Sequence, residues 1–199
     1  DDLSRGPVPT FDFQKKQIRT IAAYKINIYS PYFEHTMQYL SHPLMGPPGG
    51  TITQQQAREL VAYAARYHVT IIPEQEAFGH LHLGLQAERY QDLLEAPYGH
   101  VLSPAVPQSL DLIGQMFAEL SSAFPSPFFH IGADETAELG TGRSAALQAQ
   151  EGAGLLYLNY LKDIAARLQP YHRKILFWGD IAQRHPELLS QLPKDMIAV

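Results

Sequence analysis

Short apolar runs alternate with amphipathic helical stretches along the chain, and this alternation limits the possible folds more than any other feature. The predicted strands are residues 3–8, 25–30, 69–74, 128–132, 174–178 and 196–199. Between two of these strands, Ile113, Met116, Phe117 and Leu120 recur at helical spacing. Alternating strands and helices form parallel sheets, because each helix carries the chain back to the start of the next strand. The sequence therefore predicts an α/β domain with about six parallel strands.

One predicted helix carries a clear start signal. Thr53 is followed three residues later by Gln56, which is the pattern of a capping box. Behind it, Ala57, Leu60, Val61 and Ala64 share one helical face. Further helices are expected over about residues 13–23 and 158–168.

Two architectures fit this alternation, a doubly wound open sheet and a TIM-type (β/α)8 barrel. No Gly-rich phosphate loop follows an early strand, which weakens a nucleotide-binding interpretation. Polar residues instead follow several strand ends, at Arg5, residues 29–35, residues 74–80, residues 134–135 and residues 178–180. Side chains contributed by many strand ends are typical of barrel active sites. Residues 1–199 are therefore expected to form a single catalytic barrel domain, incomplete because about six of the eight strands are present.

Composition excludes several classes of function. The 199 residues include no cysteine, so disulfides and Cys-ligated zinc are excluded. The net charge is −5, no Lys/Arg run is present, and no apolar run approaches the length of a membrane span. We expect no nucleic-acid partner, no membrane partner and no cofactor. The compartment stays open, since export and a cytoplasmic location are both compatible with this composition.

The segment FFHIGADE, residues 128–135, ends a buried strand in two adjacent carboxylates. Strand alternation predicts two faces, with Phe128, His130, Gly132 and Asp134 toward the mouth of the barrel and Phe129, Ile131 and Ala133 toward the helices. A solvated turn is the simpler explanation of an Asp-Glu pair. The small and polar inner face instead favours an acid catalyst. Desolvation and the charge of Asp134 are both expected to favour the protonated form of Glu135, as a general acid requires.

The adjacency of the two carboxylates also indicates the type of chemistry. Most glycosidases hold two carboxylates on opposite sides of the scissile bond, which neighbours in sequence cannot easily do. Adjacent carboxylates suit a substrate that supplies its own nucleophile. A 2-acetamido sugar does so, because its carbonyl oxygen attacks the anomeric carbon and forms an oxazolinium intermediate.

Several motifs together resemble glycoside hydrolase family 20, the β-N-acetylhexosaminidases. HIGADE resembles the His-x-Gly-x-Asp-Glu signature of that family, and IIPEQEAFGH resembles its Pro-Glu-x-Asp-x-x-Gly-His segment. LSRGPVPTFDF is similar to its opening Arg-Gly segment and ILFWGDI to its Trp-bearing strand. YFEHT, beside KINIYS, is similar to a subgroup that lacks the more usual His-Trp-His segment. The resemblance extends from about residue 3 to residue 199.

The resemblance implies a role for each matching position. Glu135 would be the general acid and then the base that activates water. Asp134 would accept a hydrogen bond from the acetamido N–H and stabilise the charge that develops there. The remaining matches are substrate-binding residues Arg5, Trp178 and His35, and supporting residues His80, Glu76 and His130. Arg5 would hold the sugar hydroxyls, Trp178 would line the acetamido pocket, and Glu76 would help His80 to support Glu135.

The implied activity is retaining hydrolysis of terminal N-acetylglucosamine or N-acetylgalactosamine from an N-acetylhexosaminide, without a metal. Two departures qualify this expectation. Glu76 stands where the family usually has Asp, and the chain stops before the strands that supply a Tyr and a second Trp to the sugar. A missing C-terminal segment or a second copy in a homo-oligomer would then complete the site. We therefore expect weak or no turnover from these 199 residues alone.

Two alternatives stay open at this point. His80 and His82 form a His-x-His pair that, with His130 and Asp134, could belong to a metal-dependent barrel hydrolase. In barrel amidohydrolases, however, that pair normally follows the first strand. The other alternative is a non-catalytic remnant that binds amino sugars without cleaving them.

Overall fold

The computed structural model describes all 199 residues. Its helices are α1 (Phe11–Ala23), α2 (Gln54–Ala65), α3 (Pro107–Ala123), α4 (Ala145–Glu151), α5 (Ala153–Leu168) and α6 (Asp180–Arg184). Its strands are β1 (Ile28–Tyr29), β2 (Tyr32–Phe33), β3 (Thr70–Ile71), β4 (Glu74–Gln75), β5 (Phe128–His130), β6 (Lys174–Phe177) and β7 (Ile197–Ala198). Three short 3₁₀ helices complete the chain, η1 (Glu88–Leu93), η2 (Gln169–Tyr171) and η3 (Pro186–Gln191).

All strand pairs are parallel, and their order in space follows their order in the chain. The larger sheet runs β2-β4-β5-β6-β7, and β1 pairs with β3 beside it. A doubly wound sheet reverses its strand order at a switch point, and no reversal occurs here. The sheet winds in one direction as a barrel does, and it is open because β7 has no further neighbour. The predicted alternation of parallel strands and helices is confirmed.

Prolines interrupt two of the strand ladders. The strand predicted over 25–30 is present only as β1, and β2 follows Pro31 beyond the predicted range, whereas the stretch predicted over 69–74 becomes β3 and β4 on either side of Pro73. The register is the same before and after the prolines, with Ile28 opposite Thr70 and Tyr32 opposite Glu74. Since proline has no N–H to donate, it interrupts the hydrogen-bond ladder without changing the path of the chain.

The strand predicted over residues 3–8 is wrong. Only an isolated parallel bridge forms there, between Asp2 and Tyr32, and residues 3–6 bend away from it. Gly6, Pro7 and Pro9 explain the difference, because glycine weakens a strand and proline cannot donate to one. The chain then enters α1, whose first turn is capped by the Thr10 hydroxyl accepting from the Phe13 N–H.

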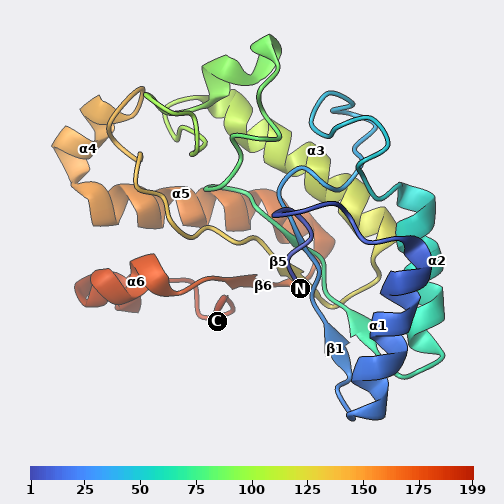
Figure 1. Cartoon of the computed structure of the whole chain (residues 1–199). Helices are drawn as coiled ribbons and strands as arrows, with labels where there is room; N and C mark the ends of the chain where they lie inside the picture. The colour runs from blue at the N-terminus through green and yellow to red at the C-terminus, as the bar shows by residue number, and fades with distance from the viewer.

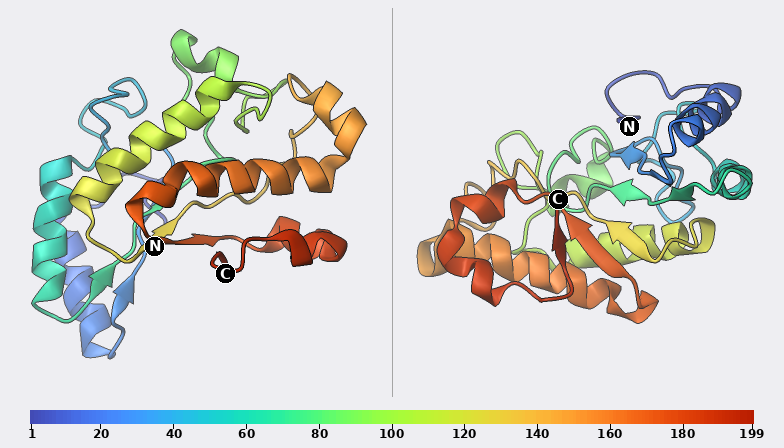
Figure 2. Two further views of the ribbon diagram at one scale, coloured as in Figure 1. Left: turned by 180° about the vertical axis from the view of Figure 1, so that it is seen from behind. Right: turned by 90° about the horizontal axis from the view of Figure 1, so that it is seen from below.

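Helices α1, α2, α3 and α5 pack side by side in chain order and form an arc along one face of the strands (Figures 1 and 2). The capping box of α2 is present as predicted, and its buried residues include Ala57, Leu60 and Ala64, whereas Val61 is only partly buried. None of the helices combines the length and apolarity needed to cross a membrane.

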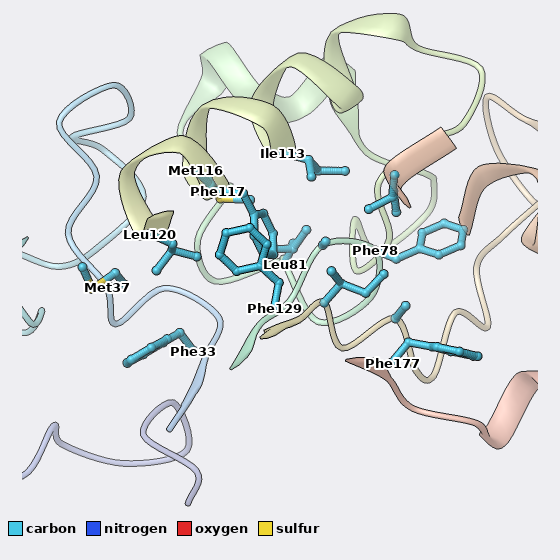
Figure 3. Packing of buried hydrophobic residues seen from close by; sticks show 14 of the residues in the cluster. Phe33, Met37, Phe78, Leu81, Ile113, Met116, Phe117, Leu120, Phe129 and Phe177 are labelled. Atoms are coloured by element: carbon cyan, nitrogen blue, oxygen red, sulfur yellow. The ribbon is translucent and has the colours of Figure 1, made fainter. Parts of the chain in front are cut away.

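The core lies between this helical arc and the strands and forms one cluster of 42 buried residues. Phe117 of α3 packs edge-on against Phe129 of β5, with ring centroids 5.0 Å apart (Figure 3). Phe129, Ile131 and Ala133 are fully buried, as predicted for the face toward the helices. Because the core fills the helical side, the other side of the strands and their carboxyl ends are left for a site.

Candidate active site

Residues from the N-terminal segment and from several strands gather around a pocket of about 420 Å³. Some lie at the start of β2 and β4 or just before β2, and others follow β5 and β6; the lining residues are Asp1, Asp2, Arg5, Ser30, Tyr32, Glu74, Asp134 and Trp178. The structure thus brings together three of the predicted site residues, Arg5, Asp134 and Trp178, from distant parts of the sequence. We call this cavity the Asp134 pocket.

The backbone between β5 and the carboxylate pair is not a strand. β5 ends at His130, and Gly132, Ala133 and Glu135 have positive φ angles of 64°, 72° and 46°. The predicted strand alternation therefore does not place Asp134. The position of Asp134 is set instead by the left-handed backbone conformation of its neighbours. Residues other than glycine adopt this conformation only where the surrounding structure stabilises it.

The surroundings of this turn are tightly fitted. A Cβ at position 132 would collide with the carboxyl group of Glu76, and one at Gly79 would collide with the carbonyl oxygen of Asp134. The carbonyl of Gly132 accepts from the Trp178 N–H at 2.9 Å, and the Ala133 carbonyl accepts from the Tyr157 hydroxyl at 2.9 Å. Glycine is required at both positions for steric reasons, and the hydrogen bonds then hold the turn that presents Asp134 and Glu135.

Asp134 is held as an ionised carboxylate. Its side chain is 25% exposed, and its Oδ2 lies 3.4 Å from Nε2 of His80. Burial alone would raise the pKa of Asp134, but hydrogen bonds from His80 and Glu76 outweigh it and lower the pKa below its ordinary value. The same hydrogen bond raises the pKa of His80. Asp134 is thus a negatively charged acceptor at the wall of the pocket.

Glu76 is completely buried directly behind Asp134. Its Oε2 accepts from the Ala133 N–H at 3.2 Å, while its Oε1 and the Oδ1 of Asp134 are both buried and have no hydrogen-bond partner. Burial and the charge of Asp134 raise the pKa of Glu76 well above its usual range. The neutral form of Glu76, which can donate to the Asp134 carboxylate, is therefore favoured. The sequence suggested that Glu76 helps His80, but the structure places its carboxyl group against Asp134.

Glu135 occupies the opposite environment. Its side chain is 71% exposed, and its Oε2 lies 3.5 Å from Nε2 of His80. The desolvation expected from the sequence is absent, since Glu135 follows the left-handed turn and its side chain is exposed. His80 therefore faces both carboxylates through one nitrogen.

The second ring nitrogen of His80 faces Arg5, whose guanidinium lies 3.4 Å from Nδ1. Arg5 forms ion pairs with Asp2 at 3.0 Å and with Glu34 at 2.9 Å. Glu34 is 3% exposed and also accepts from the Tyr32 hydroxyl at 2.8 Å, and its own N–H is held by a serine side chain. Sequence reasoning did not assign a role to Glu34. The only feature of the sequence that could have indicated a role for Glu34 is its position after a strand end. Its ion pair with Arg5 could not be predicted, because the two residues are 29 positions apart and only the fold brings them together.

Trp178 is half-buried and lines the Asp134 pocket, and its ring packs on His130 with centroids 4.8 Å apart. His130 is buried beneath the carboxylate pair, and its Nδ1 accepts from the Gly132 N–H at 3.1 Å. Burial lowers the pKa of His130 to about 4, so the ring is neutral near pH 7. Burial also raises the pKa of the neighbouring Glu74 to about 7. Glu74, which sequence reasoning left without a role, adds a titrating carboxyl to the pocket.

His35 lies apart from this pocket. It is largely buried, its Nδ1 is 4.0 Å from Glu34, and burial lowers its pKa. His82 stacks on His100, with ring centroids 4.1 Å apart, and also lies outside the pocket. No group of three or more His, Asp and Glu side chains is spaced to hold a metal ion. The arrangement therefore gives no support to a metal site built from His80, His82, His130 and Asp134.

A larger cavity of about 730 Å³ opens on the other side of the carboxylate pair. We call it the Glu135 pocket, since Glu135 and His80 line it while Asp134 does not. Glu138 also lines it, and both of its oxygens accept backbone N–H groups, from Tyr98 at 2.7 Å and from His100 at 2.6 Å. This buried carboxylate thereby ties two loops together.

Comparison with known proteins agrees with this arrangement. The model of glycosyl hydrolase family 20, catalytic domain, matches residues 30–199. A beta-hexosaminidase of Vibrio furnissii is 31% identical over 149 residues, which cover 66% of this chain and 24% of that protein. Hexosaminidase D of Homo sapiens is 27% identical over 150 residues, covering 72% of this chain and 29% of that protein. The chain thus spans about a quarter of the length of these relatives.

Solved structures share the fold. A chitobiase of Flavobacterium johnsoniae superposes with a TM-score of 0.83 at 22% identity, over 100% of this chain and 32% of that one. An exo-β-N-acetylglucosaminidase of Vibrio harveyi, solved in complex with N-acetylglucosamine, superposes with a TM-score of 0.77 at 23% identity, over 96% of this chain and 35% of that one. These likenesses confirm the predicted barrel-type fold, with the barrel not closed in this chain.

Proposed function

The chain belongs to glycosyl hydrolase family 20, and from this premise we propose that it carries the acid catalyst and the acetamido-orienting residue of a retaining β-N-acetylhexosaminidase. The substrate is a glycoside with a terminal N-acetylglucosamine or N-acetylgalactosamine. One observation carries the proposal: Asp134 and Glu135 share His80, yet they line two different pockets. A sugar in the Asp134 pocket would therefore meet an orienting carboxylate on one side and an acid on the other.

The first step of the proposed reaction breaks the glycosidic bond. The acetamido carbonyl oxygen attacks the anomeric carbon while Glu135 donates its proton to the leaving oxygen, and an oxazolinium ion forms. The acetamido N–H donates to Asp134, whose ionised form is favoured by the hydrogen bonds from His80 and Glu76. Positive charge develops beside this carboxylate, so its attraction is strongest in the transition state.

The second step restores the sugar with the same anomeric configuration. Glu135, now a carboxylate, takes a proton from water as that water attacks the anomeric carbon. The oxazolinium ring opens and returns the acetamido group. The exposure of Glu135 suits this step, because water reaches its side chain directly.

Two further residues support the binding of the sugar. Arg5 is held in place by Glu34 and Asp2 and points its guanidinium into the Asp134 pocket, where it would bind sugar hydroxyls. Trp178 gives the pocket an apolar wall for the acetamido methyl group. We propose that residues 1–199 form a single partial barrel domain that carries the catalytic residues, supported by the single core cluster beneath the site.

A direct test is the binding of N-acetylglucosamine thiazoline, a stable mimic of the oxazolinium ion, measured by titration calorimetry. The proposal predicts one binding site per chain and a crystal complex in which the ring nitrogen contacts Asp134. Absence of binding would contradict it. This measurement does not depend on turnover, which matters because the chain spans only part of its relatives.

Hydrolysis of an aryl N-acetyl-β-glucosaminide then tests the chemistry. We expect weak or no turnover from the 199 residues alone, since the residues present do not include the Tyr and second Trp expected for this family. Full turnover would overturn that expectation. Binding without turnover in any longer polypeptide would instead favour the amino-sugar-binding remnant over the enzyme.

A further inference from the structure

The Glu135 pocket has no role in the proposed binding of the sugar. It shares His80 and Glu135 with the catalytic centre, but Arg5, Asp134 and Trp178 do not line it. Its volume of about 730 Å³ lies within the range of small-molecule sites, roughly 300–1,000 Å³. The following inference rests on the proposed function, and it concerns what enters this second pocket.

The positions of the two carboxylates indicate the direction of the leaving group. A general acid must lie within hydrogen-bond reach of the oxygen that it protonates. That oxygen joins the sugar to the aglycone, so the sugar lies on the Asp134 side and the aglycone continues past Glu135. The pocket beyond Glu135 is where the aglycone would lie.

One wall of this pocket presents an exposed aromatic ring on an anchored backbone. Tyr98 is 76% exposed, which is unusual for a large aromatic side chain, and its ring lies edge-on to His100 with centroids 6.3 Å apart. The backbone of both residues is held by the buried carboxylate of Glu138. An exposed ring on an anchored backbone is suited to packing against a flat face of a ligand.

Another wall presents an unpaired positive charge. Arg184, at the end of α6, lines the pocket and has no carboxylate within 4.0 Å, whereas the neighbouring His185 is near Glu187 at 3.3 Å. The two carboxylates of the pocket do not neutralise Arg184. Glu138 is occupied by backbone N–H groups, and Glu135 faces His80.

We propose that the Glu135 pocket binds the aglycone and that Arg184 selects aglycones that carry an anionic group, either a carboxylate or a sulfate. Guanidinium groups bind both anions through paired N–H donors. Tyr98 packs against the ring of the aglycone, and Arg184 binds the anion that this ring carries. The substrate class is thereby narrowed to N-acetylhexosaminides linked to an acidic sugar or acidic aryl group.

The test compares three thioglycosides of N-acetylglucosamine whose phenyl ring carries a carboxylate, a sulfonate or a neutral carboxamide. Titration calorimetry at low salt gives the dissociation constant of each. The expected preference for an anionic ligand over the carboxamide is about threefold to tenfold, because the guanidinium is exposed. It should shrink in high salt. The carboxylate and sulfonate arms show which anion is preferred.

In Arg184→Gln, the ratio of the dissociation constants of the neutral and anionic ligands should fall to one, and the affinity for the neutral ligand should not change. Arg58→Gln, which removes an arginine of α2 distant from the pocket, is the matched control and should change nothing. Tyr98→Leu should weaken all three ligands equally. A wild-type preference of one, or a preference that survives in Arg184→Gln, overturns the inference while leaving the proposed function intact. Failure to bind any of the three ligands contradicts both.

Discussion

The Asp134 pocket and the Glu135 pocket are built differently, although the two carboxylates that define them are adjacent in the chain. On the first side, Asp134 is backed by the buried Glu76, whose pKa is raised well above its usual range, and by His80. On the second side, Glu135 is 71% exposed and has only His80 near its carboxylate. The buried side fixes one protonation state, whereas the exposed side leaves the carboxyl group accessible to water and protons.

This contrast explains how neighbouring carboxylates can have separate roles. A carboxylate that orients a substrate works best when its charge and position do not change. A carboxyl group that first gives and then takes a proton needs both states to be accessible. The positive φ angles around the pair separate the two side chains into these environments.

The sharpest test of the contrast is Glu135→Gln. In a longer polypeptide that contains these residues and shows turnover, we expect kcat for a substrate with a poor leaving group to fall by roughly 10²–10⁴, since general acid catalysis is lost. The loss should be much smaller for a dinitrophenyl glycoside, which needs no protonation to leave. Thiazoline binding should be unchanged. Glu88→Gln, at an exposed position outside both pockets, is the control.

Asp134→Asn should show the opposite pattern. The expected fall in kcat is roughly 10²–10³, as for removal of one electrostatic contact to the transition state. Here the loss should be similar for good and poor leaving groups, and thiazoline binding should weaken. If the two variants behaved alike, the division of roles between the pockets would be refuted.

Gly132→Ala tests the turn that separates the two environments. A methyl group would collide with the Glu76 carboxyl group, and the φ of 64° disfavours any side chain. We expect the free energy of unfolding to fall by about 2–4 kcal/mol in urea titrations. Gly6→Ala, where a Cβ meets nothing within 4 Å, should cost far less. If both variants lost the same free energy of unfolding, the collision with Glu76 could not be the cause.

The smallest effect concerns pH. Glu74 has a pKa of about 7 in the folded state against an ordinary value of 4.5. Its contribution to the free energy of unfolding is therefore complete below pH 4.5, where the group is neutral in both states, and is lost as pH rises toward 7. The stability of the wild type relative to Glu74→Gln should therefore decrease over this window, by at most about 1.4 kcal/mol per pH unit. Thermal unfolding at several pH values measures this difference, and a flat difference would contradict it.

His130 makes stability change with pH in the opposite direction. The wild type is therefore compared with Glu74→Gln, which separates the contribution of Glu74 from that of His130. Its pKa falls from 6.5 to about 4 on burial, so its neutral form contributes fully above pH 6.5 and that contribution is lost as pH falls toward 4. The two residues offset each other in the wild type, and their side chains lie 3.6 Å apart. In Glu74→Gln the rise in stability with pH that His130 produces should become visible.

The sequence predicted the parts of the fold that depend on local hydrophobic pattern. Buried runs around Ile71, Phe129 and Ile175 mark strands because each must be covered by a helix, and the chain order of the strands follows from right-handed crossovers. The pattern did not predict where the strands end. Pro31 and Pro73 interrupt two strand ladders, and the bend near Gly6 removed one predicted strand.

The site was less predictable because its electrostatics depend on contacts between distant segments. The types of residue at 134 and 135 could be recognised, but their burial could not, since it depends on a left-handed turn after His130. The ion pair of Arg5 with Glu34 and the anchoring of Tyr98 by Glu138 join segments that no short motif connects.

The carboxyl groups around the Asp134 pocket also couple ligand binding to proton exchange with the solvent. Burial, together with the charge of Asp134, raises the pKa of Glu74 to about 7 and the pKa of Glu76 well above its usual range, so the protonated forms of both are favoured relative to free carboxyl groups. A positively charged ring that enters the pocket would reduce the repulsion between these carboxyl groups and Asp134 and expel a proton. Cationic inhibitors should therefore bind more tightly as pH rises, and their binding heat should depend on the ionisation enthalpy of the buffer, whereas an uncharged sugar of the same shape should show neither effect.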